Sequence, residues 1–150
     1  MKTLCVVTCG KKKIWDREPD VGPTPAEEVY IGPLAVKCKE YAREFHPSSW
    51  CILSAKHGFL FPNELVRGPY NASFSDPKTA SVGARELSEQ AMKKGLIAYD
   101  RAVVLGGRNY VRMVEQVFGT EKVSCPLKGC RGNGEMMGIL KRSVLQGTPL

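Results

Sequence analysis

The sequence predicts an α/β fold in which a mainly parallel sheet of about four strands is flanked by helices. Two observations lead to this prediction. Apolar runs rich in β-branched residues alternate along the chain with segments of helical periodicity. The runs are continuously apolar, which is typical of strands that are buried on both faces of a sheet. The chain spans residues 1–150, which is the usual size of one domain, so we predict a single α/β domain.

The first strand and helix are predicted in the N-terminal third of the chain. Residues 4–9 (LCVVTC) form an apolar run that ends before glycine, as expected of a strand. A polar, proline-rich connection follows over residues 16–24. The order Thr24-Pro25-Ala26-Glu27 is typical of a capping box with proline in the first helical turn. We therefore predict a helix that starts there, is interrupted at Gly32-Pro33 and continues to about Phe45.

A second strand is predicted over residues 50–55 (WCILSA). Residues 56–80 then show no periodicity and contain several glycines and prolines, so we predict a long loop. A loop of this length inside a compact domain usually acts as a lid or a binding segment. The next helix is predicted over residues 82–94, because a basic last turn meets Gly95.

The same alternation continues to the end of the chain. We predict strands over residues 101–106 (RAVVLG) and 122–127 (KVSCPL), and helices over 109–118 and 134–146. Each of these helices carries its apolar residues on one face. Strands that alternate with helices are joined by right-handed crossovers, which makes the sheet parallel.

The charge of the chain favours an anionic partner. It carries 22 lysines and arginines against 15 aspartates and glutamates, a net charge of +7. Such a balance suits a phosphate, a nucleotide or a nucleic acid, although a basic surface is also compatible with simple solubility. No run approaches the roughly 18–20 apolar residues that span a membrane, and the N-terminus does not resemble a signal peptide. We expect a soluble, cytoplasmic protein without a membrane partner.

Glycine and basic residues follow each predicted strand. The four segments are TCGKKK (8–13), SAKHGF (54–59), GGRNY (106–110) and PLKGCRGNGE (126–135). Because the carboxyl ends of parallel strands meet at one edge of a sheet, we expect these segments to form one electropositive pocket. Glycines there let backbone N–H groups approach an anion, and helix N-termini add partial positive charge. The alternative is that the basic side chains are simply solvated. The expected ligand-binding residues of this pocket are Gly10, Lys11, Lys12, Lys13, Gly107, Arg108, Lys128 and Arg131.

Cys9 is the candidate nucleophile. It ends the first predicted strand and stands directly before Gly10 and three lysines, so we expect a lowered thiol pKa and some thiolate at neutral pH. A thiolate would suit attack on an electrophilic carbon. The alternative is an inert, half-buried cysteine in a tight turn.

Further side chains of the same segments are candidates for chemistry or for ligand contact. Lys56 suits base or Schiff-type chemistry, although a phosphate contact is the favoured interpretation. His57 is a candidate general acid or base, or a local hydrogen-bonding group. Glu135 is the one acid of the cluster and our candidate for proton transfer; the alternative is a helix cap. Three tyrosines could stack on a base or pack on the sheet edge: Tyr30, Tyr70 and Tyr110.

The cysteine pattern gives weak support for a metal. Of six cysteines, Cys125 and Cys130 form a C-x4-C pair without a matching second pair, and the two histidines are isolated. We expect no metal site, and we leave open a local disulfide or two separate thiols. None of the glycine patterns is a Walker P-loop or a dinucleotide fingerprint, so no cofactor is expected either.

Several motifs together carry a family resemblance over nearly the whole chain. They are TCGKKK, YIGPL (30–34), ILSAKHGFL (52–60) with PY at 69–70, and PLKGCRGNGEMMGIL. With its C-G-x-K, Y-x-G-P and S-A-K-x-G elements, the chain resembles a family of short proteins that share a domain of unknown function. It is similar, more distantly, to the core domain of archaeosine synthase and to proteins associated with 7-deazaguanine modification of nucleic acids. The resemblance implies a Rossmann-like three-layer sandwich. It favours these site positions: Cys9, Lys11, Tyr30, Gly32, Ser54, Lys56, Gly58 and Tyr70.

We therefore expect an enzyme that acts on a nucleobase, a nucleotide or a modified nucleic acid, with an anion-binding site at the carboxyl edge of the sheet. The alternative is a non-catalytic module that binds nucleic acid or nucleotide, or a sensor of a phosphate-bearing ligand. The sequence leaves the reaction, the substrate and the oligomeric state open.

Overall fold

The structure, a computed structural model, describes all residues from 1 to 150 and has a five-stranded sheet at its centre. The strands lie in the order β4-β3-β1-β6-β7. Four of them are parallel, and β4 runs antiparallel to β3 at one edge. The α/β fold with a mostly parallel sheet is thus confirmed, and the sheet has one strand more than predicted. The bounds are β1 Thr3–Thr8, β3 Trp50–Ser54, β4 Gly58–Leu60, β6 Arg101–Leu105 and β7 Val123–Ser124.

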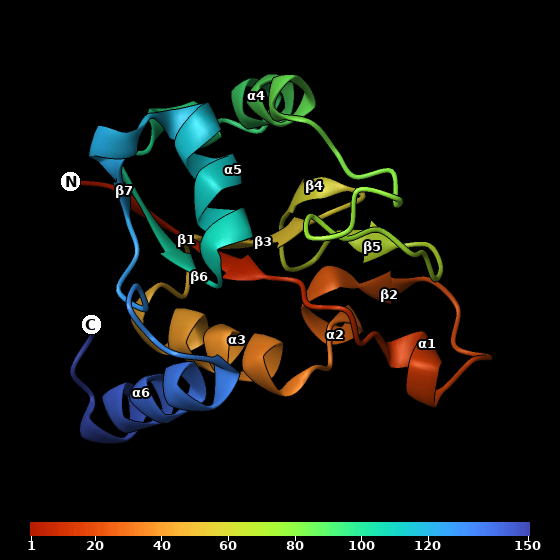
Figure 1. The fold of residues 1–150 in the computed structure, drawn as a ribbon, viewed down its shortest axis with the longest axis horizontal. Coiled ribbons are helices and arrows are strands. Elements are labelled where there is room, and N and C mark those ends of the chain that lie inside the picture. The colour runs from red at the N-terminus through yellow and green to blue at the C-terminus, as the bar shows by residue number, and fades with distance from the viewer.

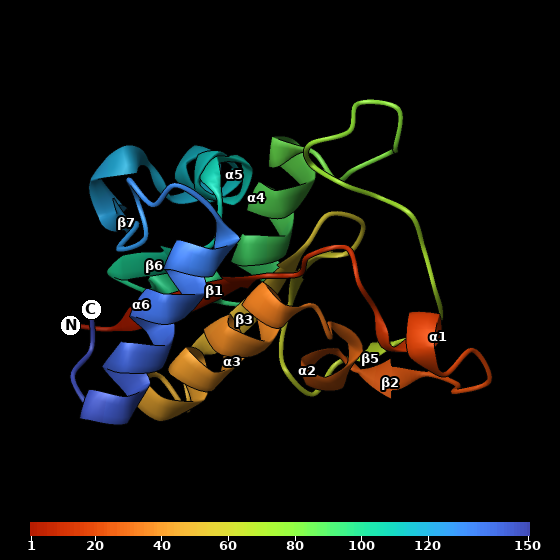
Figure 2. The same cartoon turned by 60° about the horizontal axis from the view of Figure 1, so that its bottom comes forward.

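Helices cover both faces of this sheet, giving three layers (Figure 1). On one face lie α3 (Pro33–Phe45) and α6 (Asn133–Gln146), which run side by side in Figure 2. On the other face lie α4 (Ala84–Lys93) and α5 (Arg108–Phe118). No helix combines the length and the apolar character that crossing a membrane requires.

Two hydrophobic cores explain why the strands are apolar at consecutive positions. Successive side chains of a strand point to opposite faces. In β1, Cys5 and Val7 belong to the core under α3 and α6, whereas Leu4 and Val6 belong to the core under α4 and α5. All four are at most 1% exposed. A polar residue at any of these positions would be buried without a partner, so the run must be continuously apolar.

The parallel register brings the segments that follow the strands to one edge. Thr8 lies opposite Leu53 of β3, and Val7 lies opposite Leu105 of β6. Residues just beyond these positions therefore leave the sheet next to one another. In both views β1 points toward the end of the molecule that holds α1 (Ile14–Arg17) and α2 (Ala26–Val29) (Figures 1 and 2).

The predicted loop over residues 56–80 contains two short strands. The chain turns back after β3 to form β4, and β5 (Leu65–Val66) pairs with β2 (Thr24–Pro25) in a separate two-stranded sheet. Strands of two or three residues are too short to show a hydrophobic period. The short 3₁₀ helix η1 (Leu96–Ala98) lies outside the predicted elements, and η2 (Thr120–Lys122) takes the first residue of the strand predicted over 122–127, of which β7 forms only Val123–Ser124.

The predicted capping box before α2 is wrong. The hydroxyl of Thr24 donates to the carbonyl of Gly22 (2.9 Å) rather than capping the helix, and Thr24 itself pairs with Val66 in a strand. The helix starts at Ala26 without a side-chain cap. Pairing with β5 therefore prevails over the local helix-start signal.

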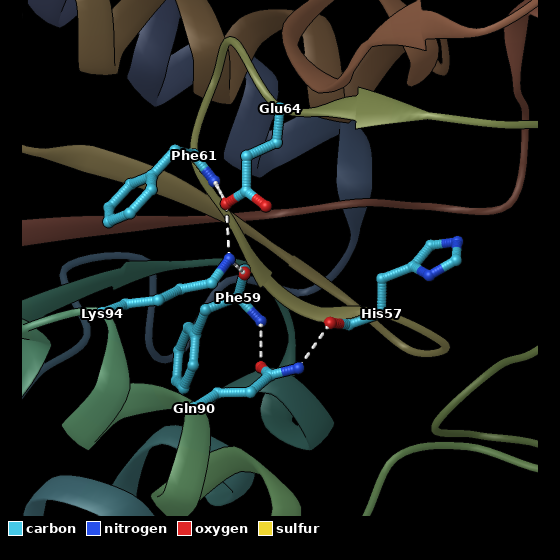
Figure 3. Close-up of polar contacts among 6 residues, drawn as sticks. All are labelled: His57, Phe59, Phe61, Glu64, Gln90 and Lys94. Atoms are coloured by element: carbon cyan, nitrogen blue, oxygen red, sulfur yellow. Dashed lines mark hydrogen bonds and ion pairs between the residues drawn. The ribbon is translucent and has the colours of Figure 1, made fainter.

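A polar network braces the outer edge of β4 (Figure 3). Gln90 of α4 donates from Nε2 to the carbonyl of His57 (2.8 Å) and accepts from the N–H of Phe59 (2.9 Å). Lys94 donates to the carbonyl of Phe59 and forms an ion pair with Glu64, which accepts from the N–H of Phe61. We call Gln90, Lys94 and Glu64 the β4 brace. These side chains satisfy backbone groups that an edge strand otherwise exposes.

Candidate functional site

Cys9 lies directly after β1 and contacts a tyrosine of α5. Its Sγ is 3.2 Å from the hydroxyl oxygen of Tyr110. The N–H of Gly10 donates to the same oxygen over 3.3 Å. Because this amide occupies the oxygen as an acceptor, the tyrosine proton is available to point at the sulfur. Gly10 makes the contact possible, since it turns the chain with a φ of 66°.

The prediction of a lowered pKa for the Cys9 thiol is wrong. The side chain is only 2% exposed, and burial raises its pKa. Hydrogen bonds from Tyr110 and the backbone of Ala55, and the charge of Lys13, act in the opposite direction but are weaker. The thiol is therefore protonated in the free protein at neutral pH.

The side chains of the three consecutive lysines do not all point the same way. Lys11 and Lys12 are exposed, whereas Lys13 is 7% exposed. Lys13 donates from Nζ to the carbonyl of Lys11 (2.9 Å), and its Nζ lies 4.4 Å from the ring centre of Tyr70. Burial lowers the pKa of Lys13, while Cys9 and Asp16 act in the opposite direction. Only the last lysine of the trio is thus built into the interior.

A chain of hydroxyl groups lies beside Lys13. The hydroxyls of Tyr30 and Tyr70 are 2.5 Å apart, and that of Tyr70 lies 2.7 Å from Ser54 Oγ. Ser54 accepts from the N–H groups of Lys56 and His57, and its own proton is free to be donated to Tyr70. We call Ser54, Tyr70 and Tyr30 the hydroxyl chain. Burial raises the pKa of Tyr30, and that of Tyr70 to about 12, so both phenols keep their protons at neutral pH.

Lys39 holds Tyr30 in place, and the sequence analysis missed it. It is 5% exposed and donates from Nζ to the carbonyls of Glu27 and Tyr30, both over 2.7 Å. These carbonyls lie at the end of α2, where a cation is favourable. Burial lowers the pKa of Lys39 to about 8. Its place between Ala35 and Ala42, both buried on α3, is the signal that identifies an inward lysine.

Lys56 and His57 lie on the outer side of Tyr70. Lys56 is exposed, with Nζ 5.6 Å from the ring centre of Tyr70. The ring of His57 meets that of Tyr70 edge-on, with ring centres 4.9 Å apart. Burial and the Lys56 cation lower the pKa of His57. Both residues thus lie against Tyr70 of the hydroxyl chain, and neither lines the hollows described next.

A hollow of about 450 Å³, which we call the central hollow, opens beside Cys9. Cys9 does not line it, but both of its neighbours at the sulfur, Gly10 and Tyr110, do. The N-termini of three helices lie at this hollow, through the N-cap residues Gly32 of α3 and Gly107 of α5 and the first residue of α6, Asn133. The predicted site residues that line it are Gly10, Lys11, Lys12, Gly32, Gly107 and Tyr110.

The three helix N-termini supply unoccupied donors. None of α3, α5 and α6 has a side-chain cap. The first N–H groups of a helix have no partner inside the helix, and the helix dipole adds partial positive charge there. With the cations of Lys11 and Lys12 on the same wall, this arrangement can hold an anion.

A second hollow, which we call the outer hollow, adjoins the first. Its volume is about 360 Å³, and it lies between α5 and the segment 125–130. Arg108 and Lys128 line this hollow and not the central one, while Gly107 lines both. The predicted pocket is therefore divided into two neighbouring hollows.

Besides Cys9, Lys13 and the residues in and around the hydroxyl chain, three further predicted residues line neither hollow. Arg131 and Glu135 are exposed, and the N–H of Arg131 donates to the carboxylate of Glu135 (3.1 Å), so this acid closes a local turn. Gly58 is buried at the start of β4, where its φ is 74° and a Cβ would lie 2.0 Å from Gln90 Oε1. Its role in the structure is to admit Gln90 and the sharp turn.

The structure groups no three histidine, cysteine or acidic side chains around a common point. All six cysteines are free thiols, including Cys125 and Cys130. Of the alternatives left open by the sequence, the structure therefore shows separate thiols at these two positions.

Comparison with known proteins identifies the family. The model of a family of unknown function, DUF6884, matches residues 4–142, and the chain belongs to this family. The chain is also similar to the uncharacterized protein YfjM of Bacillus subtilis (strain 168), with 43% identity over 145 residues that cover 96% of each chain. No solved structure matches the chain. Membership in a family with a domain of unknown function is thus confirmed, and the distant similarity to archaeosine synthase stays a prediction.

Proposed function

We propose that the protein is an enzyme that acts on a nucleobase or nucleotide, free or within a modified nucleic acid, with Cys9 as the nucleophile. The observation that carries the proposal is the position of the Cys9–Tyr110 pair against the central hollow. On one side is a thiol hydrogen-bonded to a phenol, and on the other are three uncapped helix N-termini with Lys11 and Lys12. A reactive group and an anion-binding wall thus share one residue, Tyr110.

The anionic part of the substrate would bind in the central hollow. Uncapped N–H groups and the two exposed lysines suit a phosphate, which is the charged group of a nucleotide. The volume of the central hollow, about 450 Å³, is in the range of small-ligand sites. The net charge of +7 on the chain also attracts an anionic substrate, and it does so over a longer range than the contacts in the hollow.

The reaction would be a net addition of the Cys9 thiol to an unsaturated carbon–nitrogen bond. The Sγ–C bond forms, the carbon–nitrogen π bond breaks, and the thiol proton goes to the nitrogen, so no oxidant or reductant is needed. A protonated resting thiol is compatible with such an addition, because the proton is a reactant. Tyr110 would orient the sulfur and pass the proton. The resemblance to proteins of 7-deazaguanine modification, which remains a prediction from the sequence, favours a nitrile carbon, because a nitrile carries the carbon–nitrogen π bond that this step breaks.

A non-catalytic binding module is the second candidate. The burial of Cys9 and the raised pKa of its thiol favour it, since an inert cysteine has both properties. Such a module would use the same hollow and would not depend on the sulfur.

The test combines a ligand screen with variants of the proposed nucleophile and of the lysines at the central hollow. Nucleobases including deazapurines, nucleotides and short nucleic acids are screened by thermal shift, and hits are followed by turnover assays and intact-mass detection of a thiol adduct. We expect Cys9→Ser to abolish turnover and adduct while leaving affinity nearly unchanged. Lys11→Ala should weaken binding, and Lys93→Ala, at the exposed end of α4, is its matched control.

The outcomes separate the two candidates. Turnover that survives in Cys9→Ser rejects the nucleophile. Binding that falls steeply with salt but is indifferent to Cys9, without any turnover, identifies the module instead. If Lys11→Ala and Lys12→Ala both bind as the parent protein does, the anion site itself is rejected.

A further inference from the structure

The outer hollow has walls of two kinds. Arg108, Arg112 and Lys128 supply three cations. Val111, Leu127 and Met136 form apolar surface, and the last two are 3% and 8% exposed, so they are fixed in the interior. The hollow can therefore accept charge at its rim and an apolar body on its floor.

The cations of the outer hollow are not neutralised by the protein. None of the three takes part in a salt bridge, and Glu115 is the one acid on the wall, also without an ion-pair partner. Three cations around one acid leave a positive excess. A bound anion would relieve their mutual repulsion, and arginine presents a planar fork that matches a phosphate.

The boundary between the two hollows has no side chain. Gly107 lines both, and a Cβ at this position would meet no atom within 4 Å. It is also the N-cap residue of α5, directly before the first residue of the helix. Groups bound in the two hollows would therefore be neighbours across a single glycine, with the N-terminus of α5 between them.

We propose that the outer hollow is a second subsite, which binds a nucleoside phosphate next to the one in the central hollow. Its phosphate is held by Arg108, Arg112 and Lys128, and its base or sugar lies on Leu127 and Met136. The nucleoside part of the proposal rests on the proposed function; the anion with an apolar body rests on the outer hollow itself. The ligand is either a free second nucleotide or the next residue of a strand, which the experiment distinguishes.

Two thiols of the same hollow report its occupancy. Cys125 and Cys130 line it and are half-buried, whereas the other four cysteines are at most 2% exposed. N-ethylmaleimide labelling of the native protein, resolved by peptide mass spectrometry, measures the rate at each cysteine. The probes are the four nucleoside 5′-monophosphates singly, the corresponding nucleosides, inorganic phosphate, and a mixed-sequence single-stranded hexanucleotide of DNA or RNA.

We expect a phosphorylated probe to slow labelling of Cys125 and Cys130 at least about fivefold at saturation, since a bound ligand covers both sulfurs. Nucleosides and inorganic phosphate should protect less, because each offers half of the contacts. Arg112→Ala should raise the concentration needed for protection about tenfold, the loss of one charge-assisted pair. Arg85→Ala, on the exposed surface of α4, is the matched control.

The outcomes assign or remove the subsite. Protection by a mononucleotide identifies a free ligand, and protection by the hexanucleotide alone identifies the next residue of a strand. Absence of protection by all phosphorylated probes overturns the proposal, as does protection that is unchanged in Arg112→Ala. Equal protection by inorganic phosphate overturns the nucleoside part. Repeating the assay in Cys9→Ser separates the two proposals: the subsite predicts that protection persists there, even if the role of Cys9 fails.

Discussion

Two polar networks lie on opposite sides of the turn between β3 and β4, and they use their hydrogen bonds differently. In the β4 brace, Gln90 and Lys94 direct their polar atoms at backbone groups of the edge strand (Figure 3). In the hydroxyl chain, Tyr30 and Tyr70 bond mainly to each other and to Ser54. The brace adjoins an edge of the sheet, whereas the hydroxyl chain adjoins Lys13 at the carboxyl ends of the strands.

The difference teaches how a structural network is told from a candidate site. Both networks are polar and partly buried, so burial does not distinguish them. Gln90 and Lys94 bond to backbone groups of the edge strand and are committed to the fold. The phenols of Tyr30 and Tyr70 bond to other hydroxyl groups and can exchange these partners for a ligand, although Ser54 also accepts from two backbone N–H groups. Substitutions in the β4 brace should therefore reduce stability, whereas substitutions in the hydroxyl chain should mostly reduce ligand affinity.

The largest loss of stability is expected from Gly58→Ala. The substitution forces a Cβ into a left-handed backbone and onto Gln90, which must then release His57 and Phe59. We expect a loss of about 3 kcal/mol, from strain and two unpaired backbone groups. Urea unfolding measures it. Gly138→Ala is the control, because Gly138 lies exposed in α6 with open space around it and should gain about 0.5–1 kcal/mol.

Gln90→Leu tests the brace without the backbone strain. We expect a loss of about 2 kcal/mol, because two backbone groups lose their partner while the shape of the side chain is nearly kept. Ligand affinity at the central hollow should not change. The neighbouring Glu89→Ala, on the exposed side of α4, should stay within about 0.5 kcal/mol of the parent. A Gln90 variant as stable as the parent would remove the distinction between the two networks.

Tyr70→Phe tests the hydroxyl chain. We expect a loss of only about 1 kcal/mol in unfolding free energy, the size of a typical net hydrogen bond, because the ring stays in place against Lys13 and His57. If the site function holds, ligand affinity falls by more than this change in stability implies. Tyr99→Phe serves as the comparison, since the hydroxyl of Tyr99 has no protein partner. If Tyr70→Phe and Tyr99→Phe change ligand affinity equally, the hydroxyl chain has a structural role only, as the β4 brace does.

The smallest change in the free energy of unfolding is expected from a change in pH. Burial lowers the pKa of His57 and of His46, and the Lys56 cation adds to the effect at His57. The unfolded chain then binds more protons than the folded one, so stability falls as the pH drops below about 6.5 through the folded values. The loss is small because both rings are partly exposed. In thermal unfolding between pH 7.5 and 5, His57→Gln should flatten this dependence, and an unchanged slope would contradict the contribution of His57.

The sequence predicted the layers of the fold well, because each long element carries its own signal. Continuous apolar runs located β1, β3 and β6, helical periodicity located α5 and α6, and a basic last turn before Gly95 located α4. The short strands were missed, since they depend on pairing between distant segments. Thr24 illustrates this, because its local sequence favours a helix start and its partner Val66 makes it a strand.

The sequence predicted which segments meet at the carboxyl edge of the sheet, but it did not predict the direction of their side chains or the pKa of Cys9. Parallel topology was enough to place the glycines and lysines at one edge of the sheet. The pKa of Cys9 depends on where neighbouring side chains point, and adjacency in sequence does not give that direction. Lys11 and Lys12 turn to solvent, and Lys13 turns inward. Lys39 was missed for the related reason that its function is to bond with backbone carbonyls of another helix.

The central position of β1 has a consequence for synthesis of the chain. This strand leaves the ribosome before both of its partners, which are residues 50–54 and 101–105. Until the second partner has been made, one long edge of an apolar strand lies open to pairing with other chains. Nascent chains stalled before residue 101 should therefore bind chaperones or aggregate, and they should acquire protease resistance only after β6 has emerged.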